Sequence, residues 1–329
     1  IYAISYWSRA VLIPLLIIFA HRPVCRIPSE QGIDELYLEP RAAIRYWKYP
    51  PFNKDQAWFT PHNLFVALDA LLKVYDRMPM RVLREKALHK ATTWMLEHIK
   101  GSGGLGAIYP AMANSIMALQ CLGYGADDPL VVKALGEIED LEVYDTVQLE
   151  GRRVPTLHLQ PCFSPIWDTA LLVNALIEAG VPQDHQALQR AGAYLISRQT
   201  KTVGDWIFSS PKAQPGGWYF QFENELYPDV DDSAVVLMAL SKLKLTQKAE
   251  QQESIRRGME WVVAMQGSDG GWGAYDKDNN RVIFNYIPFA DHRALLDPST
   301  SDLAGRCLEM LGMLGYDHSH PAVAPALAF

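Results

Sequence analysis

The feature that most constrains the fold of this chain is a segment that occurs twice in similar form. Residues 190–206 and 257–272 each hold a helix-like pattern with an aromatic residue, then a glutamine, then a glycine turn that leads to a tryptophan. The matched pairs are Tyr194 and Trp261, Gln199 and Gln266, and Trp206 and Trp272. Glycine permits a tight exit from a helix, and a glutamine amide can bond backbone groups left unpaired at a neighbouring helix end while the indole packs over it. The repeated segment therefore predicts a clamp that joins one helix pair to the next.

A weaker copy of the segment lies upstream, where Ile99 and Leu105 follow Trp94 in the places of the glutamine and the tryptophan. Helix-like stretches of similar sequence follow the turns, at residues 110–119, 167–176, 231–240 and 301–311. Helix pairs that recur in this way build curved arrays, in which each unit buries the face that its neighbour leaves open. Because strand signals are sparse, the sequence predicts an all-α fold, an α/α barrel (toroid) built from helix-pair repeats.

The longest stretch without a helical pattern runs from residue 141 to 164 and contains Gly151, Pro155 and Pro161. Glycine and proline punctuate loops and linkers, and domain boundaries fall in such stretches. We therefore expect two barrel domains, each partly present, one over residues 1–155 and the other over residues 156–329. In a ring of helix pairs, we expect the inner helices to begin at one rim and to direct their first residues at a central cavity.

One of these helix starts carries the acidic motif Asp229-Val230-Asp231-Asp232, shortly after an aromatic run at residues 218–222. Like charges that lie a few ångströms apart in a poorly solvated pocket cannot all ionise, so at least one carboxyl group keeps its proton at neutral pH. A strong acid beside aromatic rings is suited to protonating an alkene. The motif therefore indicates acid catalysis on a hydrocarbon.

Simpler functions also fit this motif. Aspartate is a preferred helix N-cap because its carboxylate accepts the free N–H groups of the first turn, and the apolar spacing after Asp232 is helical. Adjacent carboxylates can also hold magnesium, but the further aspartate that such sites use is missing after Asp232. The run from Asp276 to Asn280 resembles a calcium loop, but Arg281 stands where that loop needs glycine, so we interpret it as a polar turn.

The composition and the ends of the chain limit which classes of protein it can belong to. The net charge of −7 does not fit a nucleic-acid binder. The 4 cysteines form no Cys-x-x-Cys pair, which predicts reduced thiols in a cytosolic setting. The apolar run from residue 10 to 20 is too short to span a bilayer, so we expect a buried helix there. The chain begins at Ile1 without methionine and within helix-like sequence, which indicates a fragment.

With these motifs together, the chain closely resembles the squalene–hopene cyclases, class II triterpene cyclases of bacteria. The resemblance rests on the Asp-Val-Asp-Asp motif, the glutamine-to-tryptophan repeats and further segments at residues 106–112, 160–169 and 217–229. It covers essentially the whole chain, but only the middle of a family member. The resemblance implies cyclisation of squalene to hopene, and to hopanol when water captures the last cation, without a metal or a cofactor.

The resemblance also implies roles for the acidic residues. Asp231 would donate the proton to the terminal double bond of squalene, and Asp229 and Asp232 would keep its carboxyl group in the acidic state. Asp302 would lie behind the donor, near Arg306, which stands where many relatives have histidine. A fixed cation there would make Asp231 a stronger acid, and an ordinary helix salt bridge is the alternative role for Arg306.

Cations formed along the polyene need a lining that attracts positive charge without offering a lone pair, and aromatic faces supply one. By resemblance, the residues that line or shape the cavity are Trp7, Trp167, Phe220 and Tyr275, with the apolar Ile108 and Pro110. For each aromatic residue taken alone, plain core packing is the competing interpretation.

Squalene is a hydrocarbon, so we expect it to come from a bilayer. An apolar face recurs at helical spacing with aromatic and basic residues nearby: Leu64, Phe65, Leu68, Leu71, Leu72 and Tyr75, then Trp58, Phe59, Lys73, Arg77 and Arg81. This pattern favours a monotopic contact with the bacterial cytoplasmic membrane, and a helix that closes the barrel core explains the spacing equally well. A homodimer is also compatible with the resemblance.

Rival functions stay open. A class II cyclase for another polyprene would share the acid motif, and product analysis would separate the two. From a different class, the helix array could be a non-catalytic toroid that binds a ligand, or a protein prenyltransferase subunit. The latter needs a zinc site of aspartate, cysteine and histidine, and Asp302 and Cys307 lie close in sequence without an evident partner histidine.

Overall fold

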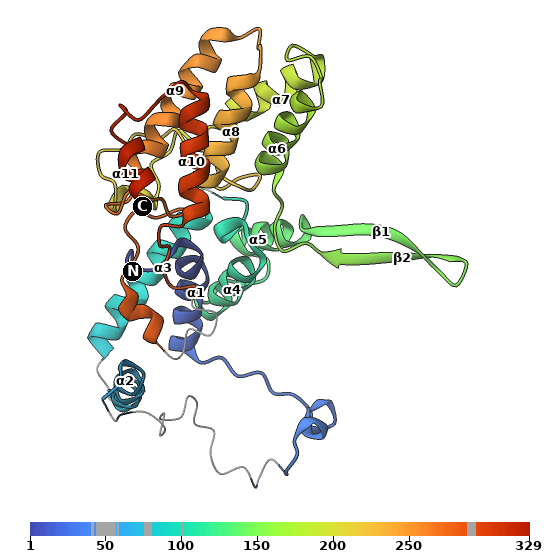
Figure 1. Cartoon of the computed structure of the whole chain (residues 1–329). Helices are drawn as coiled ribbons and strands as arrows, with labels where there is room; N and C mark the ends of the chain where they lie inside the picture. The colour runs from blue at the N-terminus through green and yellow to red at the C-terminus, as the bar shows by residue number, and fades with distance from the viewer. Residues whose placement is uncertain (41–42, 44–56, 58, 76–80, 101, 288–293) are drawn as a thin grey trace.

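The computed structural model describes all residues except 41–42, 44–56, 58, 76–80, 101 and 288–293, and it is mostly helical (Figure 1). The α-helices are α1 (Tyr6–His21), α2 (Pro61–Tyr75), α3 (Arg81–Ile99), α4 (Tyr109–Cys121), α5 (Pro129–Glu139), α6 (Pro165–Glu178), α7 (Gln186–Ser197), α8 (Val230–Lys242), α9 (Lys248–Ala264), α10 (Ser301–Met313) and α11 (Val323–Ala328). Short 3₁₀ helices include η4 (Leu105–Ala107) and η5 (Asp205–Phe208). The stretches predicted from the repeats correspond to α4, α6, α8 and α10, so the helical class is confirmed.

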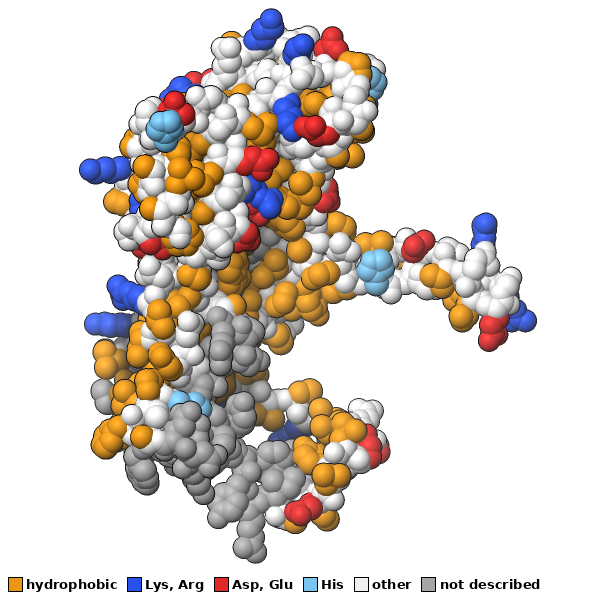
Figure 2. Space-filling model, viewed as in Figure 1, with side chains coloured by type: hydrophobic (Ala, Val, Ile, Leu, Met, Phe, Trp, Pro, Cys, Tyr) orange, Lys and Arg blue, Asp and Glu red, His pale blue; other side chains and the backbone are white. Residues whose placement is uncertain are grey.

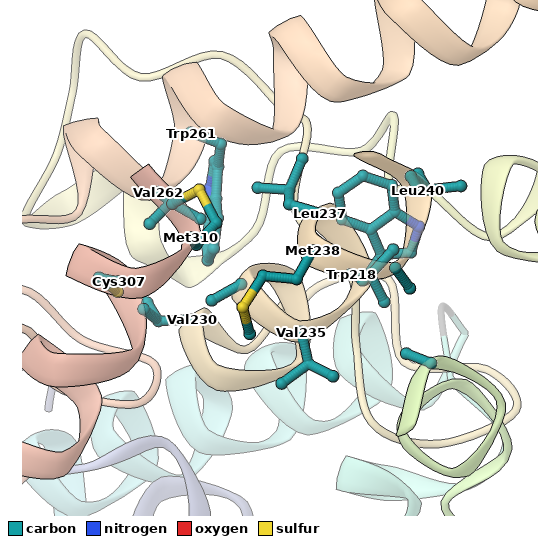
Figure 3. Close-up of a cluster of buried hydrophobic side chains, with 14 of the residues drawn as sticks. Trp218, Val230, Val235, Leu237, Met238, Leu240, Trp261, Val262, Cys307 and Met310 are labelled. Atoms are coloured by element: carbon teal, nitrogen blue, oxygen red, sulfur yellow. The ribbon is translucent and has the colours of Figure 1, made fainter. Parts of the chain in front are cut away.

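The C-terminal part of the chain is built around α8. α6 and α10 each pack against α8 to form one layer, and α7 and α9 complete the second layer. Figure 3 shows side chains of α8, α9 and α10 meeting in the core, among them Met238, Trp261 and Met310. The apolar residues of α8 therefore have partners on several sides, which fixes where this helix begins.

The N-terminal part has a core of its own, built on α1. This helix packs against α3 and α4, and Tyr6, Ile13 and Ile17 are buried on its inner face. Its opposite face carries Leu16 and Phe19, which are 59% and 74% exposed. The prediction of a buried helix is thus confirmed for one face only.

Both glutamines of the repeated segment form the predicted clamps. The side-chain amide of Gln199 donates to the carbonyl oxygens of Gly216 (2.7 Å) and of Ser254 in α9 (2.8 Å). Gln266 makes the equivalent bonds, both at 2.8 Å, to its own glycine turn and to Ala322 just before α11. Each glutamine therefore ties its own turn to a later helix.

The tryptophan assigned to the first repeat is wrong. Trp272 donates its indole N–H to the carbonyl oxygen of Val262 at 2.7 Å, and the equivalent donor in the first repeat is Trp218, which bonds Leu195 at 2.6 Å. The indole nitrogen of Trp206 is buried without a hydrogen-bond partner. The first glutamine bonds a glycine 17 residues on, whereas the second bonds one 4 residues on. Because the turn of the first repeat is longer, the spacing in the sequence did not match Trp218 with Trp272.

The stretch predicted to be irregular near residue 155 is a β-hairpin. β1 (Glu142–Leu149) pairs antiparallel with β2 (Arg152–Leu159), and the hairpin projects away from the helices (Figure 1). Glu150 and Gly151 both have positive φ, 49° and 78°, as the tight turn of a twisted hairpin requires. Pro155 argued against a strand, but a two-stranded sheet consists of edge strands, where proline is tolerated.

The apolar face predicted for membrane contact lies on α2, and its leucines are exposed. Its leucines Leu64, Leu68, Leu71 and Leu72 are 67%, 45%, 67% and 55% exposed. Hydrophobic side chains colour the surface in this part of the molecule (Figure 2). Trp58 and Arg77 lie outside the described residues.

Candidate active site

The acid motif opens α8, and backbone hydrogen bonds fix this start. The Asp229 N–H donates to the carbonyl oxygen of Trp218 at 2.7 Å, and the next N–H donates to that of Ala274 at 2.8 Å. The Asp229 carboxylate accepts from the N–H groups of Asp231 (2.6 Å) and Asp232 (3.3 Å), as an N-cap does. The capping alternative therefore describes Asp229, but not the other two aspartates.

Asp231 is the accessible acid of the motif. It is the one residue from Val230 to Leu240 that is not buried. Its side chain keeps 29% of its surface, whereas Asp229 and Asp232 are 7% and 1% exposed. Of the three carboxyl groups, that of Asp231 is therefore the one that a bound molecule can best reach.

Burial raises the pKa of the two enclosed carboxyl groups. For Asp229 the pKa rises to about 7, because burial and the charge of Asp231 outweigh the opposing effect of the Tyr275 hydroxyl. The pKa of Asp232 is raised well above its ordinary value by burial, and then by the charges of Asp229 and Asp231. Its Oδ1 atom is also buried without a hydrogen-bond partner. The motif therefore holds at least one proton at neutral pH.

Arg306, on α10, forms an ion pair with the accessible acid. Its Nε atom lies 2.9 Å from Oδ1 of Asp231, in an orientation that gives this oxygen no hydrogen bond. Burial raises the pKa of Asp231, Arg306 lowers it and Asp302 raises it. Asp302 is exposed, and its own pKa is lowered, first by a hydrogen bond from Thr300. The arginine thus favours the ionised form of a carboxyl group whose pKa burial raises.

Two of the aromatic residues predicted to line a cavity lie beside this ion pair. The guanidinium carbon of Arg306 is 5.4 Å from the ring centroid of Trp167, and the rings of Trp167 and Phe220 lie 6.5 Å apart. Both rings are partly exposed. The structure therefore brings Trp167, Phe220, Arg306 and Asp231 together near the starts of α6, α8 and α10.

Tyr275 and Trp7 form a second aromatic group, next to Asp229. Their rings meet edge to face with centroids 5.2 Å apart, and the Tyr6 ring lies 4.6 Å from that of Tyr275. Burial, followed by the charge of Asp229, raises the pKa of Tyr275 well above its ordinary value, so its hydroxyl keeps its proton. Ile108 packs against the same hydrophobic cluster.

Pro110 is the predicted cavity residue that the structure does not join to either group. It lies in the first turn of α4 and is exposed. A hollow of about 390 Å³ lies between α6, α8 and α10, and Arg306 and Asp302 line it together with apolar residues such as Met238. Asp231 is not among the lining residues. Within the described part of the chain, no group of three histidine, cysteine, aspartate or glutamate side chains could hold a metal ion.

Two family models match the chain along most of its length. One is the squalene–hopene cyclase C-terminal domain, over residues 163–329, and the other is the N-terminal domain, over residues 1–146. The chain belongs to the squalene–hopene cyclase family. Domains of this family form an α/α toroid, which confirms the fold class predicted from the repeats.

Curated relatives agree with this family. A squalene–hopene cyclase of Zymomonas mobilis is 39% identical over 330 residues, 99% of this chain and 48% of that protein. A squalene–hopene cyclase of Bradyrhizobium diazoefficiens is 40% identical over 314 residues, 95% of this chain and 46% of that protein. A dammaradiene synthase of Dryopteris crassirhizoma is 38% identical over 325 residues, 97% of this chain and 45% of that protein. The chain thus spans about half the length of these relatives.

Several buried charged residues of this cyclase-family chain were not predicted from the sequence. Arg9, Asp205 and Asp276 are 1%, 7% and 5% exposed. The Asp297 carboxylate accepts from the N–H groups of residues 274–276 at 2.7 to 3.0 Å, which fastens the backbone around Tyr275. One signal was present, since Arg9 is a charge directly before an apolar run. Asp276 was interpreted as part of a polar turn, because its distant partner cannot be read from local sequence.

Proposed function

We propose that this chain is part of a class II triterpene cyclase that converts squalene to hopene, and to hopanol when water captures the last cation. One observation carries the proposal. The start of α8 presents a single accessible carboxyl group, Asp231, backed by two enclosed carboxyl groups whose pKa values are raised. An acid of this kind is suited to a substrate that has no basic atom and must be protonated at carbon.

In the first step, the O–H bond of Asp231 breaks and its proton forms a C–H bond with the terminal alkene of squalene. The electrons of that double bond form the new bond, which leaves a carbocation on the substrate and a carboxylate on Asp231. Arg306, whose Nε atom lies 2.9 Å from Oδ1 of Asp231, stabilises this carboxylate. Behind it, Asp229 and Asp232 each keep a proton or share one. A cation that balances the charge left on the acid makes the proton transfer more favourable.

The positive charge then moves along the polyene as the rings close. Trp167 and Phe220 lie beside Arg306, and Trp7 and Tyr275 lie beside Asp229. The face of an aromatic ring attracts a cation through its quadrupole without forming a bond to it. We assign these four rings to the cavity lining, with Ile108 and Pro110 as residues that shape it.

The membrane is the proposed source of the substrate. No helix among the described residues is long and apolar enough to cross a bilayer. The exposed leucines of α2 instead support monotopic attachment, in which an apolar helix face enters the lipid interface. Two partly present barrel domains that meet near residue 155 and a homodimer belong to the same proposal, and sedimentation of the purified protein in detergent tests the dimer.

The proposal is tested with the full-length protein that carries this chain, incubated with squalene and followed by lipid analysis. Wild type should form pentacyclic products, and Asp231→Asn should lose about 10²–10⁴-fold in rate, the range that a general acid contributes. Asp145→Asn is the matched control, because Asp145 is an exposed carboxyl group of the β-hairpin, which projects away from the helices (Figure 1). Wild type that leaves squalene unchanged, or an Asp231→Asn variant with full rate, would contradict the assignment.

A second candidate is a class II cyclase with another product or another polyprene. The observation that favours it is the dammaradiene synthase among the relatives, whose identity to this chain nearly equals that of the squalene–hopene cyclases. The acid site would be the same, and the cavity shape would decide where the cascade stops. The product spectrum of the wild-type protein separates the two candidates.

A further inference from the structure

Four charged side chains form a buried cluster on the side of Tyr275 that the proposed function does not use. They come from separate parts of the chain: α1, the end of α3, η5 and the loop after Tyr275. The four residues are Arg9, His98, Asp205 and Asp276, and each is at most 8% exposed. Buried charges are costly unless they are paired, so the partners within the cluster determine what it does.

Arg9 joins the two aspartates. Its terminal nitrogens lie 3.0 and 3.3 Å from the two carboxylate oxygens of Asp276, in a two-pronged pair. Its Nε atom lies 3.4 Å from Oδ2 of Asp205, and the same oxygen accepts a hydrogen bond of 2.7 Å from the Tyr227 hydroxyl. A fork of this kind fixes direction as well as distance, because both N–H groups must meet both oxygens.

His98 joins the cluster through both of its ring nitrogens. Its Nδ1 atom lies 2.7 Å from the carbonyl oxygen of Trp94, which can only accept. Its Nε2 atom lies 3.0 Å from Oδ1 of Asp205. Both ring nitrogens therefore lie beside acceptor oxygens, those of Trp94 and Asp205. Arg9 contacts both carboxyl groups and His98 contacts one of them, which makes the four side chains one connected frame.

Two residues of this frame lie close in sequence to Tyr275 and Trp7, two of the rings that we assign to the cavity lining. Asp276 directly follows Tyr275, and Trp7 precedes Arg9 by two positions on α1. The two rings meet edge to face at 5.2 Å, and the Trp7 indole N–H donates to the carbonyl oxygen of Ala294 at 3.0 Å. The Arg9–Asp276 fork thus connects the two backbone segments that carry the rings.

We propose that Arg9 is a positioning residue for the cyclisation: through its fork with Asp276, it holds the Tyr275 ring against Trp7 and beside Asp229. This inference rests on the proposed function, because it concerns how the cavity directs the cation. Arg9 does not touch the substrate. Its loss should leave the acid step in place and let the two rings move apart, so that the cation is quenched before all rings have closed.

The test uses the full-length protein that carries this chain, with squalene as the probe and the product distribution as the readout. We compare wild type, Arg9→Met, Arg9→Lys and the double variant Arg9→Met/Asp276→Asn. Lysine keeps the charge but not the fork, and the double variant restores charge neutrality without restoring the connection. Arg256→Met is the matched control, because Arg256 is an exposed arginine of α9 whose partners among the described residues are Glu253 and Glu260.

We expect Arg9→Met to lower the ratio of fully to partly cyclised products by up to about 100-fold, the effect of a misplacement of about 1 Å. The product ratio of Arg9→Lys should lie between those of wild type and Arg9→Met, and the ratio of Arg256→Met should equal that of wild type. The double variant should regain thermal stability but keep the altered products. If the single variant does not fold, the double variant and Arg9→Lys decide by the same readout.

Three outcomes are distinguishable. Unchanged products from both Arg9→Lys and the double variant would overturn the positioning role while the cyclase assignment stands. Products that return to the wild-type pattern together with stability in the double variant would also overturn it, because they indicate a role in folding alone. Wild type that does not cyclise squalene would instead contradict the proposed function itself.

Discussion

The two clusters of buried charge in this molecule differ in one respect, their balance. Around Arg9, the two carboxyl groups of Asp205 and Asp276 have Arg9 and His98 as partners within 3.4 Å. At the start of α8, the described residues pair the three carboxyl groups of Asp229, Asp231 and Asp232 with one cation, Arg306, which contacts Asp231, the most accessible of the three. A balanced cluster fixes positions, whereas an unbalanced one must keep protons to avoid uncompensated charge.

The comparison explains how one small region can hold both a frame and an acid. The frame depends on paired side chains, and Arg9 and hydrogen-bond donors lie beside each of its carboxyl groups. The acid must hold a proton that it can release, and its carboxyl groups are buried and share a single cationic partner among the described residues. The Tyr275 loop lies between the two clusters, because Asp276 belongs to the frame and the Tyr275 hydroxyl faces Asp229.

The largest expected effect comes from breaking the balanced cluster. Arg9→Met removes the guanidinium that pairs with both Asp205 and Asp276, and removing one partner of a buried pair costs about 3–5 kcal/mol. We expect the free energy of unfolding, measured by denaturant titration, to fall by that amount. Arg256→Met should leave it unchanged. A loss of less than about 1 kcal/mol for Arg9→Met would mean that the cluster is not the frame described above.

The unbalanced cluster at the start of α8 should make the free energy of unfolding depend on pH. The unfolded chain releases the Asp232 proton near its ordinary pKa of 3.8, whereas the folded chain holds it to much higher pH. The folded state then binds more protons, so the free energy of unfolding decreases as the pH rises above about 4, by up to about 1.4 kcal/mol per pH unit.

Asp232→Asn removes the contribution of Asp232 to this dependence. The free energy of unfolding of the variant should therefore fall less than that of wild type between pH 5 and pH 8, since a neutral amide needs no proton at this site, and the variant should cyclise squalene more slowly. Denaturant titrations at pH 5 and pH 8 measure the difference. An Asp232→Asn variant that is destabilised equally at both pH values would show that Asp232 is an ordinary ionised residue.

Phe220→Ala should have a smaller effect, and it should distinguish the role of the acid from that of the aromatic lining. Phe220→Ala keeps the carboxyl groups but removes one ring whose interaction with a desolvated cation is worth about 2 kcal/mol. We expect squalene to be consumed and partly cyclised products to be released, as seen by lipid analysis. Fully cyclised product alone from this variant would remove Phe220 from the cavity.

The smallest effect concerns the one cation of the acid site. Arg306→Ala removes the charge that lowers the pKa of Asp231, so the acid should hold its proton to higher pH but transfer it less readily. We expect a cyclisation rate about tenfold lower, which corresponds to about 1.4 kcal/mol, with an upward shift of the alkaline limb of the pH–rate profile. Unchanged rate and profile would reduce Arg306 to a helix salt bridge.

The sequence predicted what depends on local pattern. The helical class, the clamps of Gln199 and Gln266 and the enclosed acid at a helix start all follow from spacing and residue type, and the structure shows each of them. The first tryptophan was misassigned because a longer turn separates Trp218 from its glutamine. The frame around Arg9 could not be predicted, since its partners lie 267 residues apart in the chain.

Some interpretations remain predictions. The roles of the aromatic residues depend on a cavity that a chain about half the length of its relatives only partly encloses. Pro110 is exposed in the first turn of α4, so its role in cavity shape has the least structural support. The domain boundary at residue 155 falls within β2 of the hairpin rather than in a linker.

The most direct test is infrared spectroscopy of the carboxyl groups in the full-length protein at pH 7. Protonated carboxyl groups have a C=O stretching band that carboxylates lack. We expect this band in wild type and a weaker band in Asp232→Asn, because burial and the neighbouring carboxyl groups raise the pKa of Asp232 well above its ordinary value. Absence of the band in wild type at pH 7 would contradict the claim that the start of α8 holds an un-ionised acid.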